Sequence, residues 1–380
     1  MTQPKRSRVR EYLSGMARPI GETALAIAIG LVGGAVIMLI WKYDPLQAYI
    51  ALFKGAFGGV DEFASTLSMA TPLILTALTF LIGVKAGLFI IGAEGQVYLG
   101  TVGAVAASLF ILPPGVHLLV ALLFSMIVGA LWSLPVAILK VTRGVHEVIS
   151  CIMMNWIAVW LTRYMVNYPL VDPARSEKTI TVAPTSRFPI LIPRTELTLA
   201  IAVSIVAAIV IYYFLWHTSL GYQFRAVGLN PEASRYAGIN QLRIIILSLV
   251  MGGMTAGLAG ATQVVGRPPT WALYGTLANI MNLGFNGLAV AMIGRTHPIG
   301  SIFAAIFFGG LYTGARQMQV PGPSPSLPYI EQLGEVVRGT AGAGVTIELI
   351  GAVQGVIVLA VAVPGALDLL RKYLRRRRGR

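Results

Sequence analysis

Charged residues, acidic residues and cysteines are all scarce in this 380-residue sequence. Only 12% of the residues are charged, whereas soluble proteins carry roughly 25%. Because 56% of the residues are hydrophobic, this scarcity excludes a large soluble core and indicates a polytopic membrane protein. The single cysteine, Cys151, excludes an intrachain disulfide and a multi-cysteine metal site.

Catalytic motifs are also missing. The sequence contains no G-x-x-x-x-G-K-[ST] phosphate loop, no H-E-x-x-H zinc pair and no G-x-S-x-G nucleophile elbow. His146 and Glu147 are adjacent at the predicted inner end of an apolar run, where a capping pair is favoured over a catalytic one. A membrane enzyme is therefore a poor third choice, and we expect no catalytic residue, metal site or cofactor in this chain.

Acidic residues number 15 against 29 lysines and arginines, which gives a net charge of +14. The basic residues gather at both ends and in short loops, without the aromatic–basic patch of a nucleic-acid-binding protein. By the positive-inside rule, this distribution predicts that the protein is oriented in the bilayer with both termini cytoplasmic. It also predicts attraction of the basic ends and loops to anionic lipid. We interpret residues 1–19 as a retained cytoplasmic tail rather than a signal peptide, and residues 365–380 as a second basic tail.

Long apolar runs predict an all-α protein with about ten transmembrane helices between residues 20 and 364, since a span needs roughly 20 apolar residues. The third run is interrupted by polar residues, and the eighth is short. The predicted spans are 20–41, 64–84, 88–112, 116–139, 147–166, 196–216, 243–265, 279–294, 298–316 and 345–364.

Two long connections fall on the outer side in this topology. The segment 167–195 is rich in proline and threonine and predicts an ordered extracytoplasmic loop, and 317–344 contains VPGPSPSLPYIEQL. Each segment could form the outer gate or contact a delivery protein. The alternative is that it only connects two spans at the surface. The connector is the favoured interpretation.

The cytoplasmic segment 217–243 predicts a short capped helix. Asn230 is placed as the N-cap, Pro231 as the first helical residue and Gly238 as the terminator. Its small exposed face, formed by Ala233, Tyr236, Ala237 and Ile239, is too meagre to insert into lipid. The pattern therefore favours docking to a soluble partner over lying on the membrane.

Two polar stripes are candidates for a translocation path, because polar side chains at membrane depth usually face a bundle interior or water. Glu147, Cys151 and Asn155 recur at i, i+4 and i+8, and Asn279, Asn282 and Asn286 at i, i+3 and i+7. The alternative is that these groups only hydrogen-bond neighbouring helices. For any single residue, a structural hydrogen bond is the favoured interpretation. For the two stripes taken together, a polar pathway is favoured.

Small residues recur every fourth position in the seventh run. Gly252, Ala256 and Gly260 share one face, and Gly253, Gly257 and Ala261 share the adjacent one. Such spacing lets backbones approach closely, so we expect this helix to pack on both sides.

The stretch GLFIIGAEGQVYLG places polar residues inside the third run. Gly92 and Gly95 permit a broken or tightly packed helix, and Glu94 and Gln96 would satisfy freed backbone donors or face an inner vestibule. Since Lys85 precedes the stretch on the cytoplasmic side, we expect the break near the inner end of the span. A structural role at an inner gate is favoured over contact between Glu94 and a solute.

Four motifs together resemble the permease subunits of ABC importers in the branched-chain amino acid, ribose and nucleoside family. They are GLFIIGAEGQ, HEVISCIMMNWIA, GYQFRAVGLNPEASRYAGIN and NGLAVAMIGRTHPIGSIFAAIFFGGLYTGA, in the family's order over most of residues 65–315. The first two look most like the guanosine and nucleoside permeases. Two departures from the family pattern are the absence of an Asn before Ile91-Gly92 and Asn286 in place of Asp.

The resemblance implies a type II importer-like bundle in the bacterial inner membrane, paired with a second, related permease. It also implies cytoplasmic ABC ATPases, which use ATP and Mg, and an extracytoplasmic solute-binding lipoprotein. The family's coupling helix sits in a groove of the ATPase. The residues implied for this coupling are Arg225, Asn230, Pro231, Ala233, Arg235, Tyr236, Gly238 and Ile239.

Three functions compete on this sequence. The first is an importer permease for nucleosides, with simple sugars such as ribose as the close alternative. The second is a proton-coupled secondary transporter in which Glu94 or Glu147 relays protons, and a purely structural membrane scaffold is a further alternative. The docking segment 217–243 and the absence of detectable inverted repeats favour the importer.

Overall fold

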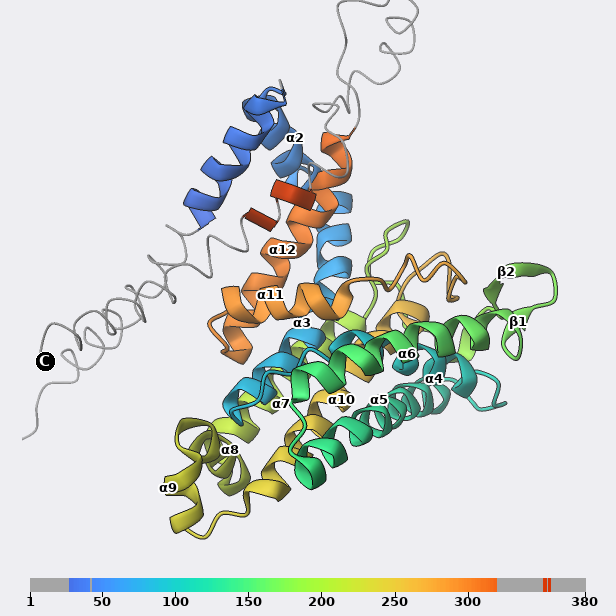
Figure 1. The fold of residues 1–380 in the computed structure, drawn as a ribbon. Helices are drawn as coiled ribbons and strands as arrows, with labels where there is room; N and C mark the ends of the chain where they lie inside the picture. The colour runs from blue at the N-terminus through green and yellow to red at the C-terminus, as the bar shows by residue number, and fades with distance from the viewer. Residues whose placement is uncertain (1–26, 42, 320–350, 354, 357–380) are drawn as a thin grey trace, which may run out of the picture. The chain divides into compact units, whose positions relative to one another are not determined.

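The computed structural model describes residues 27–41, 43–319, 351–353 and 355–356 (Figure 1). Its regular structure there is almost entirely helical. The helices are Ile27–Ile40, α2 (Pro45–Phe57), α3 (Val60–Lys85), α4 (Ala93–Ala107), α5 (Val116–Arg143), α6 (Glu147–Asn167), α7 (Ala200–His217), α8 (Ser219–Leu229), α9 (Pro231–Tyr236), α10 (Gln241–Val265), α11 (Leu283–Ile293) and α12 (Pro298–Met318).

The chain divides into two compact units, one of residues 1–55 with 314–380 and the other of residues 56–313. In the first unit, the Tyr49 hydroxyl donates a 2.5 Å hydrogen bond to the carbonyl of Leu31. Gly314, near the end of α12, lies so close to the backbone of Leu52 that a side chain would not fit. All the site residues described below belong to the second unit.

The second unit is built around α10, whose small residues contact helices on two sides. A Cβ at Gly253 would lie 2.9 Å from Cα of Ala130 on α5, and one at Gly260 would lie 2.7 Å from the amide nitrogen of Thr101 on α4. On the α3 side, the hydroxyls of Thr79 and Thr255 are 2.8 Å apart. The close packing predicted for the seventh run is therefore confirmed.

Within the part of the chain that the structure describes, six helices are long and apolar enough to cross a membrane, namely α3, α5, α6, α7, α10 and α12. The third and eighth predicted spans are shorter than expected, because α4 begins only at Ala93 and α11 only at Leu283. Helix α2 was not predicted, since it has only 13 residues and contains Lys54. The tails 1–19 and 365–380 lie outside the described residues, as do residues 320–344 of the predicted loop and most of the predicted span 345–364.

The segment 167–195 is ordered, as predicted. It forms the antiparallel pair β1 (Val171–Asp172) and β2 (Arg175–Thr179), followed by a short 3-10 turn, η1 (Pro184–Ser186). Its backbone then hydrogen-bonds to the segment after α10, with Val182 N donating to Trp271 O at 2.8 Å. Figure 1 shows this hairpin at one end of the unit and α8 with α9 at the other.

Candidate functional site

Glu94 is buried, with 3% of its surface exposed, and its carboxylate accepts hydrogen bonds from four donors. Its Oε1 accepts from the Tyr98 hydroxyl at 2.6 Å and from Asn282 N at 2.5 Å. Its Oε2 accepts from Gly284 N at 2.7 Å and from Phe285 N at 3.4 Å. The side chain therefore caps the N-terminus of α11, a helix about 190 residues farther along the chain.

A carboxylate suits this position for two reasons. The first N–H groups of a helix lack partners within the helix, and the positive end of the helix dipole favours a negative charge. Asn282, which precedes α11, has φ of 65°, so its own side chain does not cap the helix and Glu94 takes that role. The structural role favoured for Glu94 is thus the one that the geometry supports.

Non-helical residues 88–91 connect α3 to α4, with Gly92 as the N-cap of α4. Glu94 lies level with Asn155, whose Oδ1 accepts from Gly95 N at 2.9 Å. Asn155 is eight residues, or about 12 Å, from the start of α6, so Glu94 lies about that far along α6 from its first residue. The helix is interrupted as expected, but the interruption precedes Glu94. Gln96 is buried on α4, and its Oε1 has no hydrogen-bond partner.

The stripe of Glu147, Cys151 and Asn155 supports this non-helical segment. Glu147 Oε1 accepts from Phe89 N at 3.3 Å, and Asn155 Nδ2 donates to Ile91 O at 3.0 Å. Cys151 packs on Gly92, where a Cβ would lie 3.0 Å from the sulfur. The three residues do share one face of α6, and they serve to satisfy or pack irregular backbone. Asn155 also lines the smaller of the two cavities described below.

The stripe of Asn279, Asn282 and Asn286 is not a helical face, which corrects the prediction. Residues 278–282 form turns, and α11 begins at Leu283, so only Asn286 is on the helix. Asn279 Nδ2 donates to Ala272 O at 3.3 Å, while its Oδ1 is buried without a partner. The i, i+3, i+7 spacing was coincidental, because the positive φ of Asn282 interrupts any helix there.

Two neighbouring cavities follow one side of α6. The first, about 310 Å³, is bounded by Glu94, Tyr98, Asn155, Trp156, Asn282 and Phe285 among others. The second, about 550 Å³, is bounded by Trp160, Tyr164, Asn167, Tyr168, Gly275 and Thr276. Arg163 and Thr276 line both.

Arg163 was not singled out from the sequence. Its guanidinium lies 5.2 Å from the centroid of the Trp160 ring, and its Nε is buried without a hydrogen-bond partner. The only sequence signal was a charged residue inside an apolar span, which marks a functional position by default. The cavities thus combine aromatic faces, amides and one cation with unused donor capacity.

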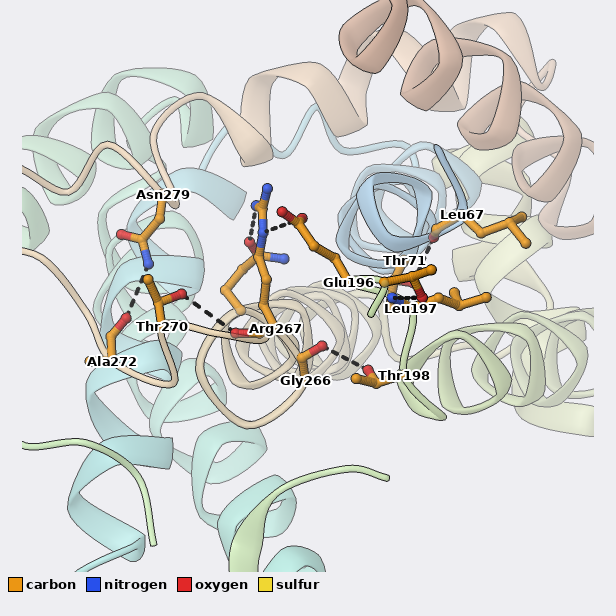
Figure 2. Close-up of polar contacts among 12 residues, drawn as sticks. Leu67, Thr71, Glu196, Leu197, Thr198, Gly266, Arg267, Thr270, Ala272 and Asn279 are labelled. Atoms are coloured by element: carbon orange, nitrogen blue, oxygen red, sulfur yellow. Dashed lines mark hydrogen bonds and ion pairs between the residues drawn. The ribbon is translucent and has the colours of Figure 1, made fainter. Parts of the chain in front are cut away.

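The segment between α10 and α11 forms part of both cavity walls, and local contacts hold it in place (Figure 2). Arg267 Nη1 donates to Gln263 Oε1 at 3.0 Å, and its Nε lies 3.4 Å from Glu196 Oε2. The Thr198 hydroxyl donates to Gly266 O at 2.7 Å. This wall is therefore anchored to the segment that precedes α7.

The predicted short helix is confirmed as α9. Asn230 Oδ1 accepts from Ala233 N at 3.1 Å, and Pro231 is the first helical residue. Gly238 follows the helix with φ of 77°, a conformation that favours glycine. Tyr236 is 92% exposed, and Ala233 and Arg235 are also exposed.

Helix α8 connects α9 to the transmembrane helices. Gly228, near its end, lies against the turn after α3: a Cβ there would be 2.9 Å from the carbonyl carbon of Lys85 and 3.0 Å from Gly87 N. That turn leads directly into the non-helical residues before α4. Arg225 is half-buried against Trp216, unlike the exposed Arg235. A continuous set of contacts therefore joins α9, α8, the Lys85–Gly87 turn and the Glu94 cavity.

Comparison with known proteins identifies relatives of this chain. The family model "Branched-chain amino acid transport system / permease component" matches residues 63–365. The chain is 37% identical to the guanosine ABC transporter permease protein NupP of Bacillus subtilis over 80% of this chain and 87% of that protein. It is 33% identical to the nucleoside ABC transporter permease protein NupB of Lactococcus lactis over 83% and 89% of the two chains.

A more distant relative is the glucose ABC transporter permease protein TsgB13 of Haloferax volcanii. It is 27% identical over 79% of this chain and 81% of that protein. No solved structure matches the chain.

Proposed function

The chain belongs to the family of permease components of branched-chain amino acid transport systems, and we propose that it is the permease subunit of an ATP-binding cassette importer for nucleosides. It is a multi-pass membrane protein. The observation that carries the proposal is the continuous contact path from the exposed helix α9 to the Glu94 cavity. Such a path lets movement of a cytoplasmic partner alter a cavity among the transmembrane helices.

The cavity suits a neutral polar solute with a planar ring. Ligand sites are mostly apolar and aromatic, with a few polar groups that fix orientation. Here Trp156 and Phe285 provide aromatic surface, and Asn155 and Arg163 provide polar groups. The guanosine and nucleoside permeases are also the relatives with the higher identity, which favours a nucleoside over the sugar alternative.

The ATPase would dock on α9. The exposed Ala233, Arg235 and Tyr236 offer a small protein-binding face, and Gly238 and Ile239 fix the exit of the chain. The partner supplies the ATP and Mg chemistry, and this chain contributes the coupling segment. The binding lipoprotein would deliver solute at the opposite end of the unit, beside β1 and β2.

A second permease would complete the path. The face of α6 beside the cavities carries exposed Trp156, Trp160 and Tyr164, with exposed fractions of 56–63%. A related subunit packed against this aromatic face would close both cavities. The chain therefore contributes half of the translocation path in a membrane heterodimer.

The proton-relay alternative is disfavoured by the contacts of both acids. Glu94 is fully used as a helix cap, and Glu147 is paired with Lys140 Nζ at 2.7 Å. Because both carboxylates are engaged in these contacts, neither is positioned to transfer protons along a water-filled path.

Uptake by proteoliposomes tests the proposal. The vesicles would hold this chain, the second permease, the ATPases and the binding lipoprotein, with labelled guanosine outside. We expect uptake to require ATP and to be competed by unlabelled nucleosides but not by ribose or glucose in large excess. Uptake driven by a proton gradient without ATP would refute the importer, and equal competition by ribose would refute the nucleoside assignment alone.

A further inference from the structure

Two half-buried cations share one indole ring at the end of α7. Lys85 Nζ lies 5.7 Å and Arg225 Cζ lies 5.9 Å from the centroid of the Trp216 ring. Among the residues that the structure describes, neither cation forms an ion pair with a carboxylate. The Nε of Arg225 is buried and has no hydrogen-bond partner. Charge removed from water without a counter-charge is costly, so an anion bound from outside the chain would stabilise this arrangement.

The surroundings of the two cations are built from four segments: the end of α3, the end of α7, α8 and the loop before α12. Lys85 Nζ donates to Thr296 Oγ1 at 3.3 Å, which leaves other N–H groups of the ammonium for a ligand. The His297 ring lies 5.1 Å from that of Trp216, and the Tyr212 ring stacks on that of Trp216 at 5.3 Å. Burial, and then the charge of Lys85, lower the pKa of His297 below its usual value. The neutral imidazole therefore does not add a third charge at neutral pH.

The position of the cluster indicates which anion it meets. Helix α7 is an apolar span that ends in Tyr212, Tyr213, Trp216 and His217, and Tyr213 is 61% exposed. Tyrosine and tryptophan gather where a span reaches the lipid headgroups. Clustered lysine and arginine at that level attract anionic lipid.

We propose that Lys85, Arg225 and Trp216 form a binding site for the phosphate of an anionic phospholipid headgroup. Arg225 belongs to α8, and Lys85 is the first residue of the Lys85–Gly87 turn on which Gly228 packs. A lipid phosphate that contacts both cations holds α8 against the end of α3, and so tightens the connection between α9 and the cavity. The site does not depend on which solute the permease carries.

Lipid binding to the purified full chain, without the ATPase, tests the site. Native mass spectrometry would measure bound phosphatidylglycerol against phosphatidylcholine for the wild type, Lys85→Gln and Arg225→Gln. We expect a preference for phosphatidylglycerol that falls about fivefold for each cation removed. Arg235→Gln, which removes an exposed arginine on the neighbouring helix α9, is the matched control and keeps the preference.

Three results would overturn the proposal. They are an unchanged preference in Arg225→Gln, an equal loss in Arg235→Gln, and displacement of the lipid by inorganic phosphate at a similar concentration. The last result would make free phosphate the ligand instead of a lipid.

A second measurement remains informative where the glutamine variants do not fold. Brominated lipids quench nearby tryptophans, and the difference between the wild type and Trp216→Phe isolates the signal of Trp216 among the six tryptophans. Brominated phosphatidylglycerol should quench this signal more strongly than brominated phosphatidylcholine. Equal quenching by the two lipids would contradict the proposed site.

Discussion

Replacing Gly228 with alanine should uncouple the ATPase from transport without detaching it. The new Cβ would lie 2.9 Å from the carbonyl carbon of Lys85 and 3.0 Å from Gly87 N, and closer still to the carbonyl oxygen of Lys85. Ordinary contacts of this kind are 3.4 Å or longer, so α8 and the turn must separate by about 0.5 Å or more. These neighbours are backbone atoms, which cannot rotate away.

The expected magnitude follows from two opposing effects. Overpacking costs about 1–3 kcal/mol, and alanine in place of glycine within a helix recovers up to about 1 kcal/mol. Because the clash is with backbone atoms, the upper part of the overpacking range applies, about 2–3 kcal/mol. The net loss of about 1–2 kcal/mol shifts the equilibrium away from the packed arrangement by a factor of about 5–30. We expect ATP-driven uptake to fall by a similar factor, while the ATPase still co-purifies because α9 is unchanged.

The matched control is Gly144→Ala, at the turn between α5 and α6. Gly144 has φ of 66°, so alanine is strained there too, but nothing lies within 4 Å of the added Cβ. This variant should lose some stability and keep its coupling ratio. Wild-type uptake by a folded Gly228→Ala protein, or loss of ATPase binding from it, would refute the reasoning.

Three further predictions concern the cap, the cavity and the docking helix. Glu94→Gln places an amide NH₂ against N–H donors, so the free energy of unfolding should fall by about 1–3 kcal/mol. Thermal unfolding in detergent measures this loss. Tyr98→Phe, which removes one hydrogen bond to Glu94, should lower the free energy of unfolding by less. Arg163→Gln removes the cation shared by both cavities and should lower uptake about tenfold or more. The affinity of the binding lipoprotein for the solute should stay unchanged. Unchanged uptake would place Arg163 outside the translocation path. Replacing both Arg235 and Tyr236 with Asp should detach the ATPase while the permease stays inserted, and wild-type co-purification would exclude α9 as the docking helix.

Local sequence signals predicted local structure well. Asn230, Pro231 and Gly238 identify α9 because the cap, the first turn and the terminator each depend on neighbouring residues only. The small residues of α10 were equally informative, since close helix packing requires them wherever the partner lies.

Non-local structure was not predictable in the same way. The partner of Glu94 is a helix N-terminus about 190 residues away, and no local pattern connects the two. The asparagine stripe failed because periodicity does not reveal the positive φ of Asn282. Arg163 was missed because its cavities form only when α6 meets the segment after α10.

The most direct test of the coupling path uses a thiol in the cavity. Cys151 is buried, so the single native thiol should react slowly, and Met281→Cys places an exposed thiol on the wall of the Glu94 cavity. In the assembled importer, addition of ATP should change the labelling rate of this cysteine, and Gly228→Ala should abolish that change. A rate that ATP leaves unaltered, or alters equally in the Gly228→Ala background, would contradict transmission from α9 through α8 to the cavity.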